Sequence, residues 1–130
     1  MNILGMIRIG AALLAIALPA FPAAGGALER AREQYGQTDY QAALKTLDAI
    51  PHKDAAVYEL IGKALYMQGE FKRASQAFEK AVKAQPSSST LQNWLGRAYG
   101  RRAETASFIT APGLASKART CFERAVELNP

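Results

Sequence analysis

The chain has 130 residues, of which 49% are hydrophobic, and carries a formal net charge of +5. This length allows one small domain with a modest core, and the single cysteine, Cys121, excludes a disulfide within the chain. The positive charge is compatible with nucleic acid or an anionic surface, but no basic run is longer than Arg101-Arg102, which favours an ordinary solvated helical surface.

The amino-terminal segment differs from the rest of the chain. Residues 9–18 are all apolar or glycine, Arg8 precedes them, and small residues and prolines follow over 19–27. These features are typical of a secretory signal peptide, and the apolar run is shorter than the roughly 20 residues that a bilayer requires. We predict a signal peptide over residues 1–26, cleaved after Gly26 or one residue later, and a periplasmic or secreted bacterial protein. A retained membrane anchor or an extra buried helix is the alternative.

Two short helices are predicted after this segment. The first covers about residues 28–35, and the second begins near Tyr40. The second helix has apolar or small residues at helical spacing, namely Tyr40, Ala43, Leu47 and Ile50. Each of them precedes an equivalent residue of the helix that begins at Phe71 by the same number of residues. Because Pro51 comes directly after Ile50, we expect this helix to end there, and the first pair to cover about residues 27–53.

Residues 54–88 contain the clearest predicted helix pair. Its first helix has apolar or small residues three and four apart, at Tyr58, Ile61, Gly62 and Leu65. Gly69 can adopt a positive φ and end this helix. The second helix continues the spacing at Phe71, Ala74, Phe78, Ala81 and Val82, and Pro86 follows its end. Small residues at Gly62 and Ala74 are expected to let the two antiparallel helices approach closely.

The third predicted pair, over residues 89–130, is longer. Ser89-x-x-Gln92 is typical of a capping box at a helix start. In the first helices, Gly96 follows its counterpart Gly62 at the regular repeat distance along the sequence. In the second helices, Ala118 follows its counterpart Ala74 by more residues than that. Extra residues must therefore lie between Tyr99 and Ala118. Pro112-Gly113 is the only strong stop in between, so we expect the extra residues to lengthen both helices into a projecting hairpin.

A pattern with a fixed spacing connects the last two pairs. Ile61, Gly62 and Leu65 return at one constant separation as Leu95, Gly96 and Tyr99. In the second helices, Ala74-x3-Phe78-x2-Ala81 returns as Ala118-x3-Phe122-x2-Ala125, and Pro130 corresponds to Pro86. The period of about 34 residues in the first helices, with a small residue beside a large apolar one and then Ala-x3-Phe, resembles the tetratricopeptide repeat. The enlarged third copy looks like a variant found in exported bacterial proteins of that family.

The resemblance implies an all-α fold of antiparallel helix pairs, stacked as a short right-handed superhelix. It assigns residues 27–130 to one repeat domain that follows the signal peptide. Proteins of this family bind a peptide or protein partner, and the resemblance implies no cofactor. Arrays of this kind usually finish with an additional helix. We therefore expect either a truncated member of a longer family, or a carboxyl-terminal end covered by a partner or by a second copy in a homo-oligomer.

Residues that could form a catalytic or metal site are scarce. His52 is the only histidine, and no second imidazole or thiol accompanies it. Glu29 and Glu33 lie one helical turn apart, but a solvated face explains them better than a catalytic dyad. The chain offers no nucleophile with a base and an orienting group. We therefore expect no enzyme activity, no metal, no nucleic acid partner and no membrane contact after signal cleavage.

The predicted binding surface lies on the first helix of each pair, which in tetratricopeptide arrays lines a concave groove. Helical rotation places seven residues there: Glu59, Lys63, Tyr66, Met67, Asn93, Arg97 and Arg101. The last three are four residues apart and form one strip. Two guanidiniums and an amide could bind a carboxylate or an acidic peptide through paired hydrogen bonds. The alternative is that these are ordinary exposed side chains.

A second contact site is predicted at the tip of the lengthened hairpin. Phe108, Ile109 and Leu114 lie near it, although a solvated hairpin does not need three large apolar residues. They could instead pack on one another across the Pro112-Gly113 turn. From these features we predict a noncatalytic scaffold or adaptor in the bacterial cell envelope. The alternative function is a structural subunit of an envelope complex, or a module that associates with itself.

Overall fold

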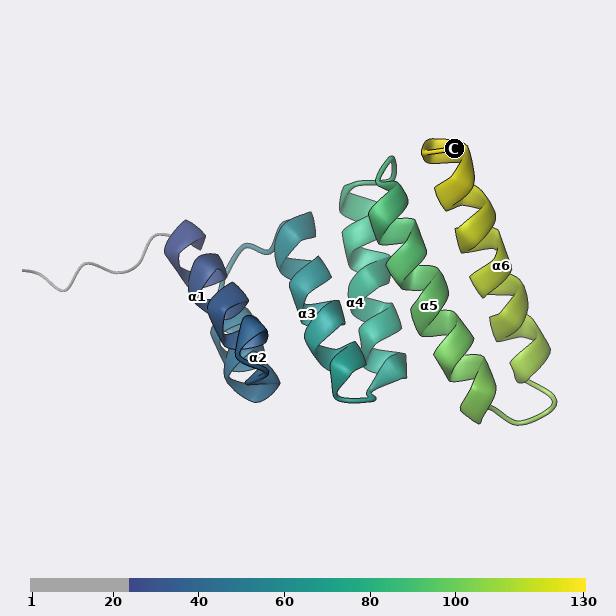
Figure 1. Cartoon of the computed structure of the whole chain (residues 1–130), viewed down its shortest axis with the longest axis horizontal. Coiled ribbons are helices and arrows are strands. Elements are labelled where there is room, and N and C mark those ends of the chain that lie inside the picture. The colour runs from purple at the N-terminus through teal and green to yellow at the C-terminus, as the bar shows by residue number, and fades with distance from the viewer. Residues whose placement is uncertain (1–23) are drawn as a thin grey trace, which may run out of the picture.

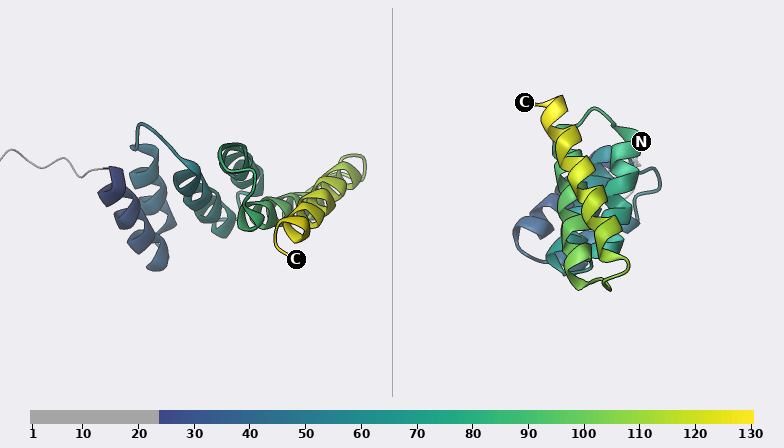
Figure 2. Two further views of the ribbon diagram at one scale, coloured as in Figure 1. Left: turned by 90° about the horizontal axis from the view of Figure 1, so that it is seen from above. Right: turned by 90° about the vertical axis from the view of Figure 1, so that its right-hand side faces the viewer.

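The structure, a computed structural model, describes residues 24–130 as six α-helices. They are α1 (Ala24–Gly36), α2 (Tyr40–Asp48), α3 (Ala55–Met67), α4 (Phe71–Ala84), α5 (Ser89–Thr105) and α6 (Ala111–Leu128). Neighbouring helices form three pairs, α1 with α2, α3 with α4 and α5 with α6, which follow one another along the long axis (Figure 1). Figure 2 shows the same order from above. The expected all-α fold of paired helices is confirmed for these residues.

The predicted signal peptide lies outside the described residues except for its last three, which form part of the first turn of α1. Helix α1 therefore begins before the predicted start at about residue 28. Within residues 24–130, no helix combines the length and the apolar character needed to cross a membrane.

Helix α2 ends earlier than the sequence predicted. It stops at Asp48, and Ile50 lies beyond its end, although Ile50 is still only 3% exposed. Pro51 explains the early end, because the residue before a proline is disfavoured in the helical conformation. At the start of α2 the carboxylate of Asp39 accepts a hydrogen bond from the Ala42 amide (3.1 Å), an N-cap that shortens the connection from α1.

Two turns with the same geometry connect the helices of the first and second pairs. Gly69 ends α3 with a φ of 79°, and the Glu70 amide donates to the Leu65 carbonyl (2.9 Å). Thr38, at the equivalent position of the first pair, has a φ of 62°, and the following amide of Asp39 donates to the Gln34 carbonyl (2.9 Å). The left-handed conformation predicted at Gly69 is confirmed. It also occurs at a threonine, a β-branched residue that rarely adopts it.

The helices of the second pair touch where the sequence places its small residue. A Cβ atom at Gly62 would lie 2.6 Å from Cε1 of Phe78, so only glycine leaves room for this ring. Phe78 and Ala74 on α4 are fully buried. The third pair repeats the contact, since a Cβ atom at Gly96 would lie 2.8 Å from Phe122. The expected close approach at Gly62 and Ala74 is therefore confirmed.

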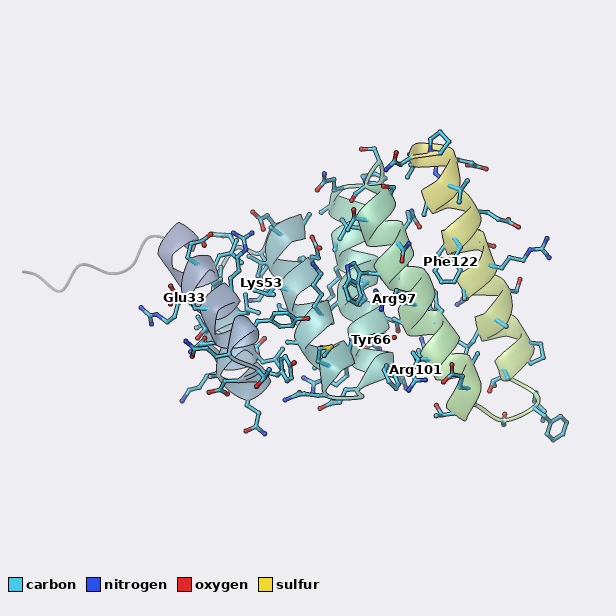
Figure 3. The ribbon with its side chains drawn as sticks, in the orientation of Figure 1. Glu33, Lys53, Tyr66, Arg97, Arg101 and Phe122 are labelled. Carbon is cyan, nitrogen blue, oxygen red and sulfur yellow. The ribbon has the colours of Figure 1, made fainter. Side chains whose placement is uncertain are left out.

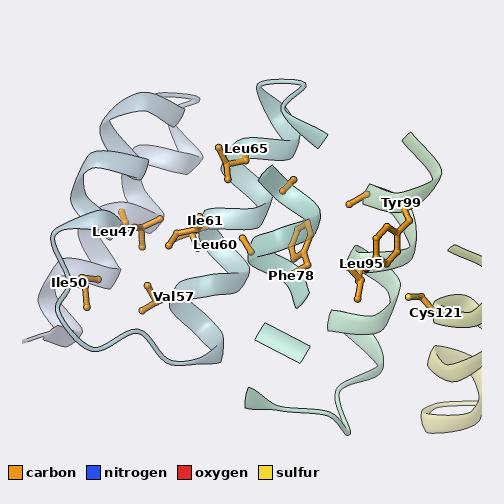
Figure 4. Close-up of a cluster of buried hydrophobic side chains, with 14 of the residues drawn as sticks. Leu47, Ile50, Val57, Leu60, Ile61, Leu65, Phe78, Leu95, Tyr99 and Cys121 are labelled. Atoms are coloured by element: carbon orange, nitrogen blue, oxygen red, sulfur yellow. The ribbon is translucent and has the colours of Figure 1, made fainter. Parts of the chain in front are cut away.

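One continuous core runs through all three pairs (Figure 4). Its large members are Leu47, Ile50, Val57, Leu60, Ile61, Leu65, Phe78, Leu95, Tyr99 and Cys121. Burial raises the pKa of the Cys121 thiol, and the charge of Glu79 adds to the rise. A buried thiol with a raised pKa has little thiolate, as expected for an inert structural cysteine.

The third pair is longer than the second in both of its helices. Helix α5 has 17 residues against 13 in α3, and α6 has 18 against 14 in α4. The connection between α5 and α6 is at residues 106–110, so the prediction of a stop at Pro112-Gly113 was wrong. Both residues lie in the first turn of α6, where proline is well tolerated because the amide it lacks would have no helical partner.

The start of α5 also differs from the predicted capping box by one residue. Ser88 is the N-cap, and its Oγ accepts a hydrogen bond from the Leu91 amide (3.2 Å), whereas Ser89 is already helical. Two polar contacts then join α4 to α5. The Tyr99 hydroxyl donates to the Glu79 carboxylate (2.6 Å), and Arg102 donates to the Oγ of the fully buried Ser75 (3.0 Å). These contacts hold the third pair against the second.

Replacing Gly62 with alanine should destabilise the fold. The added methyl group would force Phe78 out of a filled site, and overpacking of this kind costs about 1–3 kcal/mol. The matched control is Gly100→Ala on α5, where the added Cβ meets nothing within 4 Å and should stabilise the helix by about 0.5–1 kcal/mol. Urea denaturation followed by circular dichroism measures both changes. Equal effects of the two substitutions would contradict the close approach at Gly62.

Replacing Thr38 with glycine should stabilise the fold. Glycine removes the cost of a left-handed conformation, about 1–2 kcal/mol. It also gives the unfolded chain more conformational freedom, which makes folding slightly less favourable, so we expect a net gain in stability of about 0.5–1 kcal/mol. Gln37→Gly is the control, because it adds the same unfolded-state freedom at an exposed neighbour whose φ is not positive. The prediction fails if both variants are less stable than the parent chain in the same urea titration.

Candidate interaction surface

The first helices of the three pairs share one face of the molecule. Helix α3 contacts α1 and α5 in addition to its pair partner α4. Tyr35 on α1 is near enough to Arg97 on α5 to be affected by its charge. Burial raises the pKa of the Tyr35 hydroxyl, Tyr40 adds to the rise, and the positive charge of Arg97 opposes it. Helices α1, α3 and α5 are therefore neighbours on this face.

Trp94 on α5 is at the centre of this face. Its ring stacks on Phe78, with ring centroids 5.7 Å apart and planes 19° apart, and meets Tyr66 edge-on at 5.7 Å. The guanidinium of Arg97 lies 4.4 Å from the centroid of Trp94, and the Lys63 ammonium lies 5.3 Å from it. Two cations from different helices thus lie over one indole ring.

A second cation and ring pair lies beside the first. The Arg101 guanidinium is 4.9 Å from the ring centroid of Phe71, and Phe71 meets Tyr66 edge-on at 5.1 Å. Figure 3 shows Tyr66, Arg97 and Arg101 close together where α3 faces α5. We call the set Lys63, Tyr66, Phe71, Trp94, Arg97 and Arg101 the cation–aromatic cluster.

An open hollow of about 550 Å³ adjoins this cluster. It is lined by Tyr66, Met67, Gln68, Gly69, Phe71 and Arg101. Met67 is 50% exposed, an unusual exposure for a large apolar side chain. The hollow therefore combines an apolar wall with a guanidinium, which suits a peptide that carries both an apolar side chain and a carboxylate.

The three cations of the cluster differ in their partners. Lys63 forms an ion pair with Glu59 on the same helix (2.6 Å), and Arg101 pairs with Glu104. Arg97 has no carboxylate partner among residues 24–130. Its guanidinium contacts the faces of Trp94 and Tyr66, and such contacts leave its in-plane N–H groups available to an acceptor. Arg97 is thus the cation best placed to bind a carboxylate.

The structure brings six of the seven predicted groove residues together and separates one. Glu59, Lys63, Tyr66, Met67, Arg97 and Arg101 all lie in or beside the cluster. Asn93 lies instead in another hollow, shared with Trp94, Phe122 and Val126. The four-residue spacing from Asn93 to Arg101 spans two turns, and the α-helical rotation of about 100° per residue turns such a strip gradually around the axis. Asn93 therefore faces α6.

Two residues at the centre of the cluster were absent from the predicted set. Phe71 was assigned only to the helix spacing of α4, and Trp94 was given no role of its own within the third pair. Trp94 is the single tryptophan of the chain and comes between Asn93 and Arg97, which was a usable signal. Its position over Phe78 could not be read from the sequence, because Phe78 belongs to the preceding pair.

The predicted hairpin-tip residues separate into two environments. Phe108 is 87% exposed and Ile109 is 76% exposed, both in the connection between α5 and α6. Leu114 lies one turn into α6 and packs, partly buried, against the core. The alternative in which all three pack on one another is therefore wrong for Phe108 and Ile109, and Leu114 is not at the tip.

No group of side chains in the described part of the chain has the arrangement of a metal site. Among residues 24–130, no three His, Cys, Asp or Glu side chains are placed to bind one ion. His52 is exposed in the connection between α2 and α3.

Comparison with known proteins identifies one part of the chain. The family model of the Tetratricopeptide repeat matches residues 55–88, which are α3, α4 and the turn that follows. A search of curated proteins found no match to this chain. Residues 55–88 therefore form a tetratricopeptide repeat within an all-helical protein of paired helices, and repeats of this kind are protein-interaction modules.

Replacing Arg97 with alanine should uncover the indole of Trp94. We expect stronger quenching of tryptophan fluorescence by acrylamide, and a loss of about 0.5–1 kcal/mol in unfolding free energy from the missing cation–π contact. Arg119→Ala is the control, because that side chain is 82% exposed and pairs with Glu123 on α6. Quenching that is unchanged by the loss of Arg97 would show that the guanidinium does not cover the ring.

Proposed function

We propose that this chain is a noncatalytic adaptor of the bacterial cell envelope. It binds a peptide or protein partner along the face formed by α1, α3 and α5. The observation that carries the proposal is the cation–aromatic cluster, which adjoins the tetratricopeptide repeat at residues 55–88. Export by a signal peptide over residues 1–26 is part of the proposal, and it rests on the sequence alone.

The flanking helix pairs support an array of three repeats with a right-handed superhelical sense. The turn at Thr38 has the geometry of the turn at Gly69, and the Gly96 contact with Phe122 repeats the Gly62 contact with Phe78. In this interpretation α5 and α6 are an enlarged third repeat. Stacking of three pairs creates the shared face, because each first helix alone offers only one strip of side chains.

The proposed partner is an acidic segment in an extended conformation. Lys63, Arg97 and Arg101 concentrate positive charge on this face, and among residues 24–130 only Glu59 and Glu104 pair with them. A carboxylate that reaches Arg97 would find two parallel N–H donors on a guanidinium already held against Trp94. Because Trp94 restricts that side chain before binding, less conformational entropy is lost when the ligand arrives.

One observation supports the alternative function, a structural subunit or a module that associates with itself. The last pair exposes an apolar strip on α6, where Phe122 is 39% exposed and Val126 is 63% exposed. Both line the hollow that contains Asn93 and Trp94. A second copy, or a subunit of an envelope complex, would bury this strip.

Reversal of charge at the cluster separates the two functions. Arg97→Glu with Arg101→Glu should weaken capture of an acidic partner several-fold or more, since a hydrogen bond to a charged group contributes about 1.5–3 kcal/mol. Capture by the parent chain should also fall as salt rises. The control, Arg119→Glu with Arg124→Glu, makes the same change in net charge on α6, away from the cluster.

The measurement is affinity purification from envelope extracts with the parent chain and both double variants. Proteins that are lost only with the Arg97 and Arg101 variant are the predicted partners. Capture that is the same with all three chains would reject binding at the cluster. Light scattering of the parent chain then decides the alternative, because self-association through α6 requires a dimer or larger species at micromolar concentration.

A further inference from the structure

The connection between α5 and α6 presents two large apolar side chains to solvent. Phe108 and Ile109 are 87% and 76% exposed, the two most exposed large apolar residues among those described. They are the central residues of a four-residue turn, Ser107 to Thr110, at the corner of the molecule where α5 ends and α6 begins (Figure 1). Glycine, proline, asparagine and aspartate normally occupy such positions, so the turn itself does not explain a phenylalanine and an isoleucine there.

Hydrogen bonds hold this turn in one shape. The Thr110 and Ala111 amides both donate to the Ser107 carbonyl, at 3.0 and 2.8 Å. The hydroxyls of Ser107 and Thr110 are also hydrogen-bonded to each other at 3.0 Å. Because its two ends are joined, the turn directs Phe108 and Ile109 outward with little freedom to fold back onto the helices.

Basic side chains without acidic partners lie next to the turn. A hollow of about 620 Å³ is lined by turn-side residues Thr105, Ala106 and Thr110 together with Lys72, Arg73 and Arg102. Arg73 pairs with Glu70 at 2.7 Å, and Arg102 donates to the buried Ser75, whereas Lys72 pairs with no carboxylate of residues 24–130.

Lys117 on α6 is a second cation of this kind. It lies over the ring of Tyr99, as Arg102 does, and also pairs with no described carboxylate. An apolar tip is thus followed, one to two turns back along its helices, by unpaired positive charge.

We propose that the Ser107–Thr110 turn inserts into the headgroup region of an anionic lipid surface. Phe108 and Ile109 would enter the boundary of the acyl chains, and Lys72 and Lys117 would face lipid phosphates. Apolar side chains backed by lysine and arginine are the arrangement that binds such an interface. The sequence led us to expect no membrane contact, and the exposure of this turn is the observation that changes that expectation.

A lipid surface fits these residues better than a socket on another protein. A convex tip of two side chains needs no matching pocket to enter a fluid interface. A protein socket would have to desolvate the two nearby lysines or supply a carboxylate for each. This inference does not depend on the proposed function, because the turn and the cation–aromatic cluster share no residue.

The test measures contact at one position of the full chain. Phe108→Trp places a fluorescent probe in the turn, and its signal is the difference from the parent chain, whose single tryptophan is Trp94. Val126→Trp is the matched control, since Val126 is 63% exposed on α6 but is not in the turn. Each chain is mixed with vesicles of phosphatidylcholine alone, or with an added third of phosphatidylglycerol, carrying brominated acyl chains as quenchers.

We expect the probe at position 108 to shift to shorter wavelength and to be quenched at least about twofold by the anionic vesicles, as for a side chain about 5–10 Å deep. The probe at position 126 should be unaffected. Adding Lys72→Gln and Lys117→Gln to the Phe108→Trp chain should raise the lipid concentration for half-maximal quenching about tenfold or more, because each cation near the surface contributes to binding.

Two results would overturn the proposal. One is the absence of quenching at position 108 in both kinds of vesicle, which would leave a protein socket as the use of the turn. The other is equal quenching at positions 108 and 126, which would show that another segment, such as the apolar residues 9–18, brings the chain to the bilayer without the turn. A far-ultraviolet circular dichroism spectrum confirms that each variant is folded.

Discussion

The burial of Phe78 between two helices is the constraint on which the rest of this structure depends. One side of its ring lies against the backbone of Gly62, where a Cβ atom would be only 2.6 Å away. Another side stacks on Trp94 of the next pair. A single fully buried side chain therefore sets the distance between α3 and α4 and also the place where α5 packs on them. Since Arg97 lies over Trp94, the same stack connects the core to the surface that is proposed to bind a partner.

The third pair has the ring contact within the pair but, among the described residues, lacks the stacking contact with a further pair. Phe122 lies against Gly96 as Phe78 lies against Gly62, but no aromatic residue of the described chain stacks on its outer side. Its ring is 39% exposed, whereas that of Phe78 is fully buried. The contact within a pair thus forms without help from the next pair, and the contact between pairs is what removes the ring from water. Apolar area that stays exposed at the end of a stack is unfavourable by about 25 cal/mol per Å².

The two candidate surfaces use charge in different ways. In the cation–aromatic cluster the guanidiniums lie over rings, which restricts them, and Arg97 has N–H groups left for a ligand because it has no carboxylate partner among residues 24–130. Near the Ser107–Thr110 turn, Lys72 on α4 and Lys117 on α6 lie behind an apolar tip without carboxylate partners among the described residues. The first arrangement favours a ligand with carboxylates at fixed positions. The second arrangement favours a surface with negative charge on the outside and an apolar layer beneath it.

The sequence by itself determined the features that depend on neighbours along the chain. Helical spacing placed the paired helices, Gly69 marked a turn with positive φ, and the pattern at Gly62 and Phe78 indicated their close contact. Rotation within one helix also assigned Lys63, Tyr66 and Met67 to one face. Each of these follows from the geometry of a single helix or of one short connection, which is the same wherever the helix packs.

Only the tertiary structure decided which residues of different helices meet. It placed Trp94 under both Arg97 and Lys63, turned Asn93 toward α6, and buried part of Leu114 while leaving Phe108 in solvent. The connection at residues 106–110 was missed for the same reason. Pro112 is a stop signal by local rules, but it is equally compatible with the first turn of a helix, and the packing of α6 against α5 selects the second. Such choices depend on distances between helices, which the spacing of residues within one helix does not encode.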